Sequence, residues 1–173
     1  MPQREQCACF TGHRELDAAE LPGLRQALAL TLEAAWDQGY RHFYSGGALG
    51  FDLLAAEAVL ACKCRHEEIV LEMVIPHGHQ TSGWPETERC RHERLCYAAD
   101  ERKILSPLYY RGCYHVRNRY MVDRSGLCLC YFTHVRGGTA YTVAYAAREG
   151  VRLVNLAMES SWRAFVEQKK KDG

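Results

Sequence analysis

The sequence predicts an α/β protein with a Rossmann-like fold, a three-layer sandwich in which helices flank a mostly parallel central sheet. Apolar strand-like runs alternate with helix-like segments throughout the 173 residues, and this alternation favours right-handed crossovers between parallel strands. Residues 69–75 are almost entirely apolar, as expected for a strand that is covered on both faces. Neither a linker nor an internal repeat is visible, so we expect residues 1–173 to form a single domain.

The individual elements are predicted from apolar periodicity and from the positions of glycine and proline. Pro22 fits the first turn of a helix, and Gly39 and Gly150 end helical patterns. The expected strands cover residues 6–10, 41–45, 69–75, 102–105, 127–132 and 152–156. The expected helices cover residues 20–38, 52–64, 85–100, 116–125, 137–149 and 160–170, and the Lys-rich tail that follows is expected to fray.

The charge of the chain is nearly balanced. Lysine and arginine number 22, aspartate and glutamate number 21, and the formal charge is +1. A neutral chain has no overall field that steers it to a polyanion, so we expect nucleic acid to be an unlikely partner. The first residues carry several charged side chains, and no apolar run is long enough to span a bilayer. We therefore expect a cytoplasmic protein without a membrane partner.

The nine cysteines occur partly in C-x-C pairs, which differ from the C-x-x-C spacing of structural zinc sites. Cys7 with Cys9 and Cys128 with Cys130 fall in strand-like runs. Alternate residues of a strand share one face, so these cysteines are interpreted as small core residues. The histidines form no metal-binding spacing with neighbouring carboxylates. We expect neither a metal site nor a cofactor.

One glycine-rich stretch lies between a predicted strand and a predicted helix: Ser45-Gly46-Gly47-Ala48-Leu49-Gly50-Phe51-Asp52. Glycines let a ligand approach the main chain, and a helix N-terminus offers unpaired N–H groups to an anion. Gly47 and Gly50 match the dinucleotide fingerprint G-x-G-x-x-G, whereas Ser45 replaces its first glycine. The stretch is interpreted as a phosphate site, with an ordinary glycine-rich turn as the alternative.

Two further clusters follow predicted strands. Thr11-Gly12-His13-Arg14 follows the first strand as a loop, and Gly137-Gly138-Thr139 opens the helix after the fifth. Ligands of parallel sheets bind outside the carboxyl ends of the strands, so we expect both clusters and residues 45–52 to line one crevice. An arginine such as Arg14 can clamp a phosphate. The tyrosines of residues 106–115 are available to stack on a ligand, although a packed surface loop is the alternative.

Four motifs occur here in an order known from one protein superfamily. They are residues 10–14, residues 45–52, Arg117-Asn118-Arg119-Tyr120-Met121-Val122-Asp123 and residues 137–139. With them the chain resembles the SLOG superfamily, which joins the Smf/DprA proteins and the "lonely guy" phosphoribohydrolases, and most closely its YpsA/YspA-like branch. The resemblance implies a Rossmann-like fold, a nucleotide or nucleotide-derived ligand at the glycine motifs, and a homo-oligomer, since many members are homodimers.

The phosphoribohydrolase branch hydrolyses the N-glycosidic bond of nucleoside 5′-monophosphates with an arginine and a glutamate. The resemblance assigns the arginine to Arg117, but residues 140–144 lack the glutamate, which weakens the case for hydrolysis. Asp52 and Asp123 are the nearest carboxylates that could replace it. Asp52 is equally explained as a helix-start cap or a ribose ligand, and Asp123 as a partner of Arg119 in a surface ion pair.

The sequence therefore favours a protein that binds or senses a nucleotide-derived ligand, with a nucleotide N-glycosidase as the alternative and a DNA-binding protein as the weakest reading. Whether any reaction is catalysed stays open. The candidate catalytic residues are Arg117, Asp52 and Asp123. The candidate ligand-binding residues are Thr11, Gly12, His13, Arg14, Ser45, Gly46, Gly47, Ala48, Gly50, Asp52, Arg117, Asn118, Gly137, Gly138 and Thr139.

Overall fold

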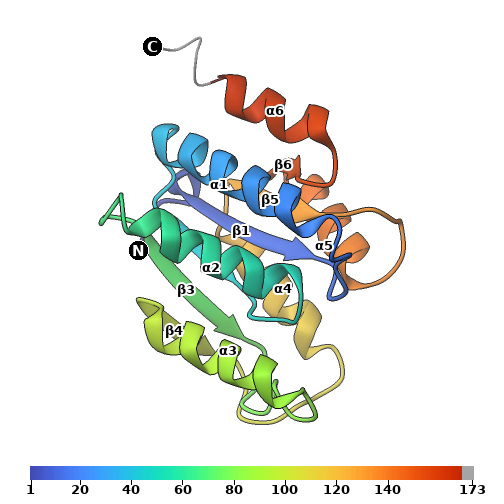
Figure 1. Ribbon diagram of the computed structural model, residues 1–173. Helices are drawn as coiled ribbons and strands as arrows, with labels where there is room; N and C mark the ends of the chain where they lie inside the picture. The colour runs from blue at the N-terminus through green and yellow to red at the C-terminus, as the bar shows by residue number, and fades with distance from the viewer. Residues whose placement is uncertain (169–173) are drawn as a thin grey trace.

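A computed structural model describes residues 1–168 of the protein. Its centre is a six-stranded sheet in the order β4-β3-β2-β1-β5-β6, in which all neighbouring strands are parallel (Figure 1). The strands are β1 (Cys7–Gly12), β2 (His42–Ser45), β3 (Val70–Ile75), β4 (Glu101–Ile104), β5 (Leu127–Tyr131) and β6 (Arg152–Asn155). The helices are α1 (Leu21–Asp37), α2 (Phe51–Lys63), α3 (Glu86–Ala98), α4 (Cys113–Asp123), α5 (Gly138–Arg148) and α6 (Glu159–Gln168), preceded by the short 3-10 helix η1 (Arg4–Gln6).

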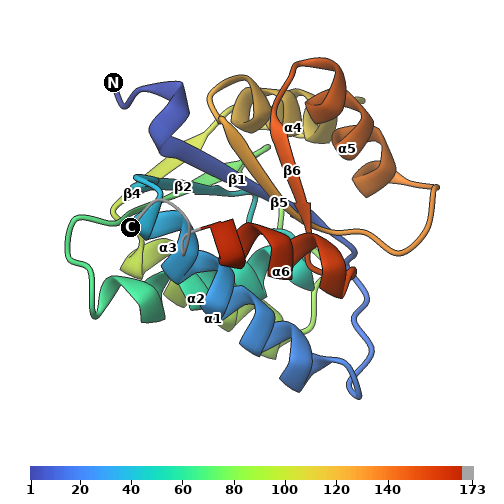
Figure 2. The same ribbon diagram turned by 90° about the horizontal axis from the view of Figure 1, so that it is seen from above.

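The helices form two layers around the sheet. Helices α1, α2, α3 and α6 cover one face, and α4 and α5 cover the other (Figure 2). This arrangement confirms the predicted Rossmann-like sandwich. The chain proceeds from β1 outward to β4 and then returns to pair β5 with the opposite edge of β1. The point where the strand order reverses, between β1 and β5, is where parallel sheets bind ligands.

Each face of the sheet has its own hydrophobic core. The core beneath α1, α2 and α6 contains the stacked rings of Phe10 and Phe43. The core beneath α4 and α5 contains four strand cysteines, and each is at most 2% exposed: Cys7, Cys9, Cys128 and Cys130. The interpretation of the C-x-C pairs as core residues is confirmed. All nine cysteines are free thiols.

Several predicted boundaries move by one to three residues in the structure, and two of these shifts bear on the site. Strand β1 continues to Gly12, because Thr11 and Gly12 pair with Cys130 and Tyr131 of β5. Helix α4 begins at Cys113, three residues before the predicted start at 116, with Gly112 as its N-cap. The tail expected to fray lies outside the described residues. Within residues 1–168 no helix combines the length and the apolar character needed to traverse a bilayer.

Candidate functional site

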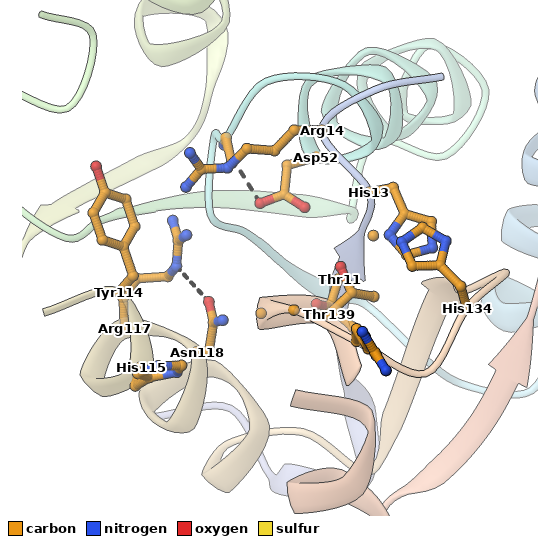
Figure 3. A pocket seen from close by; sticks show the side chains of 15 residues that line it. Thr11, His13, Arg14, Asp52, Tyr114, His115, Arg117, Asn118, His134 and Thr139 are labelled. Carbon is orange, nitrogen blue, oxygen red and sulfur yellow. Dashed lines mark hydrogen bonds between the residues drawn. The ribbon is translucent and has the colours of Figure 1, made fainter. Parts of the chain in front are cut away.

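A cavity of about 290 Å³ lies at the carboxyl ends of the strands, beside the reversal of strand order (Figure 3). Figure 3 shows Arg14, Tyr114 and Arg117 on one side of it and the paired rings of His13 and His134 on the other. It is lined by Thr11, Gly12, His13, Arg14, Ala48, Asp52, Tyr114, His115, Arg117, Asn118, His134, Arg136, Gly137, Gly138 and Thr139. The structure thus brings residues from the ends of β1 and β5 together with residues from α2, α4 and α5.

Arg117 is the most deeply buried cation of the cavity, with 3% of its surface exposed. Its Nη1 donates hydrogen bonds to the carbonyl oxygens of Gly46 and, at 3.4 Å, of Val74. Its Nε donates to Oδ1 of Asn118 at 2.7 Å. Burial lowers the pKa of Arg117, and the nearby carboxylate of Asp52 raises it. Arginine keeps its proton in proteins, so the cavity contains a fixed positive charge.

Asp52 is a buried acid in the first turn of α2, with 5% of its surface exposed. Its Oδ2 accepts a hydrogen bond from the backbone N–H of Ala48 at 3.4 Å. Burial raises the pKa of Asp52 from 3.8 to about 6, although Arg117 and the Ala48 N–H oppose the increase. A carboxyl group with such a pKa exchanges its proton near neutral pH, which suits acid–base chemistry.

In the first glycine turn, residues 45–50, neighbouring protein atoms occupy the positions that side chains on Gly46 and Gly50 would take. A Cβ on Gly46 would lie 2.7 Å from Oδ2 of Asp52, and a Cβ on Gly50 would lie 2.6 Å from the carbonyl oxygen of His13. Gly50 also has φ +77°, a conformation that favours glycine. Of this predicted phosphate site only Ala48 and Asp52 line the cavity, whereas Ser45, Gly46, Gly47 and Gly50 do not.

The second glycine turn is open. A Cβ on Gly137 or Gly138 would meet no atom within 4 Å, and Gly137 has φ +92°. Gly137 is the N-cap of α5, so the N–H groups of the first helical turn have no partner within the helix. These groups and the positive end of the helix dipole face an edge of the cavity, where an anion would be stabilised.

A chain of hydrogen bonds connects the two glycine turns through Arg117. Nδ2 of Asn118 donates to Oγ1 of Thr142 at 2.8 Å, and this hydroxyl donates to the carbonyl oxygen of Gly138 at 3.0 Å. Asn118 also accepts from Arg117, which donates to Gly46. The Asn118 amide therefore orients the buried guanidinium and at the same time fixes the start of α5.

The far rim of the cavity is formed by two histidines. The rings of His13 and His134 are parallel, with centroids 4.0 Å apart. The backbone N–H of Thr133 donates to Nε2 of His13 at 3.0 Å, so this nitrogen carries no proton. Burial, assisted by the proximity of His134, lowers the pKa of His13. The pair thus presents two stacked, flat rings at the rim.

Asp123 is the predicted catalytic residue that the structure places away from the cavity. It is exposed at the C-terminal end of α4, and its Oδ1 accepts a hydrogen bond from the hydroxyl of Tyr145 at 2.7 Å. It does not line the cavity, whereas Arg117 and Asp52 do. Asp52 is therefore the acid that remains available for chemistry at this site.

The sequence did not identify three lining residues, His115, His134 and Arg136, and it placed Tyr114 in a loop, among the tyrosines of residues 106–115 that are available to stack on a ligand. Tyr114 lies three residues before Arg117 on α4, and residues spaced in this way share a helix face. Its ring lies 5.2 Å from the guanidinium carbon of Arg14 and 5.8 Å from that of Arg117. The helical spacing from Arg117 was the signal that could have identified it.

Potential metal ligands gather outside the cavity. Within residues 1–168, Glu33, Cys62 and His66 are the one group of at least three potential ligands whose ligand atoms all lie within 4.8 Å of one another. The Glu33 carboxylate is already paired with Arg65 and, at 2.7 Å, with Nε2 of His66. These contacts satisfy the carboxylate without an ion.

Solved structures with the same fold include DNA processing protein A from two bacteria. The Helicobacter pylori protein, whose structure describes its single-stranded DNA binding mode, is 16% identical with a TM-score of 0.63 and coverage of 98% of this chain and 82% of that protein. The Streptococcus pneumoniae protein is 14% identical with a TM-score of 0.60, and this chain spans 57% of its length. At these identities the likeness shows the fold.

The H. pylori structure corrects the expectation that nucleic acid is an unlikely partner, because a protein of this fold binds single-stranded DNA. The total charge was the wrong quantity to consider. Although the chain carries only +1 overall, its cavity contains three arginines (Arg14, Arg117 and Arg136) against the single carboxyl group of Asp52. In nucleic-acid-binding proteins in general, clustered lysines and arginines make the phosphate contacts, whatever the net charge of the chain.

A sequence relative, UPF0398 protein BH1768 of Halalkalibacterium halodurans, is 30% identical over 128 residues, which cover 72% of this chain and 68% of the relative. A similar protein of Bacillus cereus, UPF0398 protein BCAH187_A1726, is 25% identical over 138 residues, 76% of this chain and 73% of the relative. The model of the YspA SLOG family matches residues 9–155. The chain belongs to the YspA SLOG family.

Proposed function

We propose that this protein binds a nucleotide or a nucleotide-derived ligand in the cavity between β1 and β5. The observation that carries the proposal is the open N-terminus of α5 beside the arginines of a cavity at the reversal of strand order. Unpaired backbone N–H groups together with guanidinium groups are the usual partners of a phosphate. In this proposal the phosphate lies at Gly137–Gly138 and contacts Arg136.

The size of the cavity supports a small ligand. Its volume of about 290 Å³ is at the lower limit of the roughly 300–1,000 Å³ found for small-molecule sites. A mononucleotide, or one nucleotide unit of a longer molecule, fits this volume better than a dinucleotide. The exposed ring of His115 and the half-buried ring of Tyr114 line the same cavity and offer faces on which a base can stack.

Calorimetric titration with AMP, GMP, CMP and UMP, and with a single-stranded oligothymidylate, tests the proposal. Arg136→Ala removes an exposed guanidinium from the cavity. A charge-assisted hydrogen bond contributes about 1.5–3 kcal/mol, so affinity should fall about ten- to a hundredfold. The matched control is Arg148→Ala, at the opposite end of α5. If no nucleotide binds, or if both variants bind like the wild type, the proposal is wrong.

Arg117→Ala is a less direct test. The Arg117 guanidinium holds the Gly46 carbonyl and orients Asn118, so its removal changes the folded structure and the ligand site together. The exposed Arg136 separates the two effects. Arg117 is proposed to act on the ligand chiefly as a buried positive charge.

Hydrolysis of an N-glycosidic bond is the second candidate, and one observation favours it: the Asp52 carboxyl lines the cavity with its pKa raised to about 6. A carboxyl group in this state can activate water or protonate a leaving base. Chromatography of nucleoside monophosphates incubated with the protein would detect the released base. Release by the wild type and its loss in Asp52→Asn, with binding retained, would establish this activity; no release would exclude it for these nucleotides.

The homodimer, the single domain and the cytoplasmic location expected from the sequence are also part of the proposal. Sedimentation equilibrium measures the mass of the particle directly. A monomer at concentrations of about 100 μM would reject the dimer, because an obligate interface has a far lower dissociation constant.

A further inference from the structure

The loop between β4 and α4, residues 105–112, presents large apolar side chains to solvent. The sequence leaves open whether its tyrosines stack on a ligand or pack into the surface. In the structure Leu108, Tyr109 and Tyr110 are 64%, 62% and 44% exposed, so they do not pack into the protein. A contiguous group of exposed apolar side chains, unlike a single one, marks a surface that binds a ligand or a partner.

Tyr109 is the ring that connects this loop to the cavity. Its centroid lies 6.4 Å from that of Tyr114, which lines the cavity, whereas Tyr109 does not line it. The ring of His77 packs against both, with centroids 5.5 Å from Tyr109 and 5.7 Å from Tyr114. Tyr109 is therefore the next aromatic ring beyond the wall of the cavity.

His77 holds the ring of Tyr114 in place. It is buried, and the backbone N–H of His79 donates to its Nδ1 at 3.3 Å. Nδ1 therefore carries no proton, and the protonated Nε2 donates to the hydroxyl of Tyr114 at 3.3 Å. Burial, assisted by the proximity of His79, lowers the pKa of His77, which favours this neutral form.

The backbone on either side of Tyr109 is held as well. The N–H of Gly78 donates to the carbonyl oxygen of Ser106 at 3.1 Å. The N–H of Cys113 donates to the carbonyl oxygen of Tyr110 at 3.1 Å. The exposed ring is thus presented on a fixed backbone, so a molecule that stacks on it pays little for ordering the loop.

Positive charge accompanies the two tyrosine rings. Arg14 lines the cavity and is exposed, with its guanidinium carbon 5.2 Å from the ring of Tyr114. Arg111, in the same loop as Tyr109, is exposed and has no ion-pair partner within residues 1–168. Aromatic rings beside arginines are the combination with which proteins bind single-stranded nucleic acid, since the rings stack on bases and the arginines meet phosphates.

We propose that the ligand is a single strand of nucleic acid, with one nucleotide in the cavity and the next base stacked on Tyr109. The inference rests on the proposed function, because the first nucleotide is the one proposed for the cavity. The 6.4 Å between the rings of Tyr109 and Tyr114 is about twice the roughly 3.4 Å that separates consecutive bases in a duplex. The bases are therefore bound apart from each other, which a single strand allows and a duplex does not.

Calorimetric titration with AMP and with its 5′-phosphorylated dinucleotide, pApA, tests the inference. The dinucleotide should bind about tenfold more tightly than AMP, because stacking on an aromatic side chain contributes about this much for each base. In Tyr109→Ala this advantage should disappear while the affinity for AMP stays unchanged, and Tyr109→Phe, which keeps the ring, should retain the advantage. Tyr110→Ala is the matched control, since it removes a neighbouring exposed ring, and it should bind both ligands like the wild type.

The same comparison of dAMP with pdApdA distinguishes a DNA strand from an RNA strand. If neither dinucleotide binds more tightly than its mononucleotide, or if the advantage persists in Tyr109→Ala, the inference is wrong although the proposed function stands. A weaker affinity for AMP in Tyr109→Ala would also overturn it, because Tyr109 would then act on the cavity itself. If no mononucleotide or dinucleotide binds, both the inference and the proposed function fail.

Discussion

The two glycine turns look alike in the sequence but differ in the structure. Residues 45–50 are packed against the backbone of His13 and Arg14 and the side chains of Asp52 and Arg117. A Cβ on Gly137 or Gly138 would have open space around it, and both glycines border the cavity. In the first turn, the absence of a side chain lets other parts of the chain pack directly on the glycine backbone. In the second turn, it leaves backbone groups accessible to a ligand. The surroundings of a glycine, more than its motif, decide which role it has.

The largest effect is expected from Gly46→Ala. The added methyl group would lie 2.5 Å from Cζ of Arg117 and 2.7 Å from Oδ2 of Asp52, and both of these groups are held in place by burial. Overpacking and displacement of a buried charge should reduce the free energy of unfolding by about 3 kcal/mol or more. Urea denaturation measures this. Gly138→Ala, in open space, is the control and should change stability by less than about 0.5 kcal/mol; equal losses would remove the distinction between the turns.

A second prediction concerns the acid that the packed turn encloses. The pKa of Asp52 in the folded chain is about 6, above its ordinary value of 3.8. Between these two pH values the folded chain therefore keeps a proton on Asp52 that the unfolded chain has already lost. The stability that Asp52 contributes is present below pH of about 4 and lost as pH rises through about 6. At about 1.4 kcal/mol for each pH unit, this loss amounts to at most about 3 kcal/mol.

Asp52→Asn isolates that loss. The free energy of unfolding of wild type and variant should be measured by urea denaturation at pH 4 and at pH 7. The wild type should lose about 2–3 kcal/mol more than the variant over this interval. Parallel pH profiles would mean that Asp52 is already ionised at pH 4 and that Arg117 controls its charge.

A smaller effect than that of Gly46→Ala is expected from Gly137→Ala, which probes the open turn. The alanine meets no atom but must adopt φ +92° with ψ −170°, a region used almost only by glycine, and this backbone strain should cost about 1–3 kcal/mol. Thermal unfolding monitored by circular dichroism measures the cost. A loss as large as that of Gly46→Ala would show that the second turn is packed against protein in solution.

The fold could be predicted from the sequence because its signals are local. Pro22 occupies the start of α1, and Gly39 and Gly150 follow the ends of α1 and α5 with positive φ. The end of β1 was missed because the apolar run stops at Phe10 and because glycine, here Gly12, is disfavoured in strands. Thr11 and Gly12 are held in the sheet by Cys130 and Tyr131, more than a hundred residues away, and such pairing leaves no trace in local composition.

The site could be predicted only in part for the same reason. The polar residues that follow β1 and β5 identified one edge of the sheet, and the cavity is there. The sequence could not distinguish a glycine that borders a cavity from one that borders Arg117, because both stand between a strand and a helix. It also could not show that Asp123 lies outside the cavity, at the C-terminal end of α4, where it accepts a hydrogen bond from Tyr145. These outcomes depend on which side chains meet after the helices pack.

The central position of β1 has a consequence for the order in which the protein is made. Strands β2, β3 and β4 can pair in succession beside β1 as the chain emerges from the ribosome, but the other edge of β1 stays unpaired until β5 has been synthesised. An open strand edge is prone to wrong pairing. The cavity is lined by Gly137–Thr139 as well as Thr11–Arg14, so it is not formed until α5 has been synthesised. Until then the early half depends on the core that α1, α2 and α3 form on one face of the sheet.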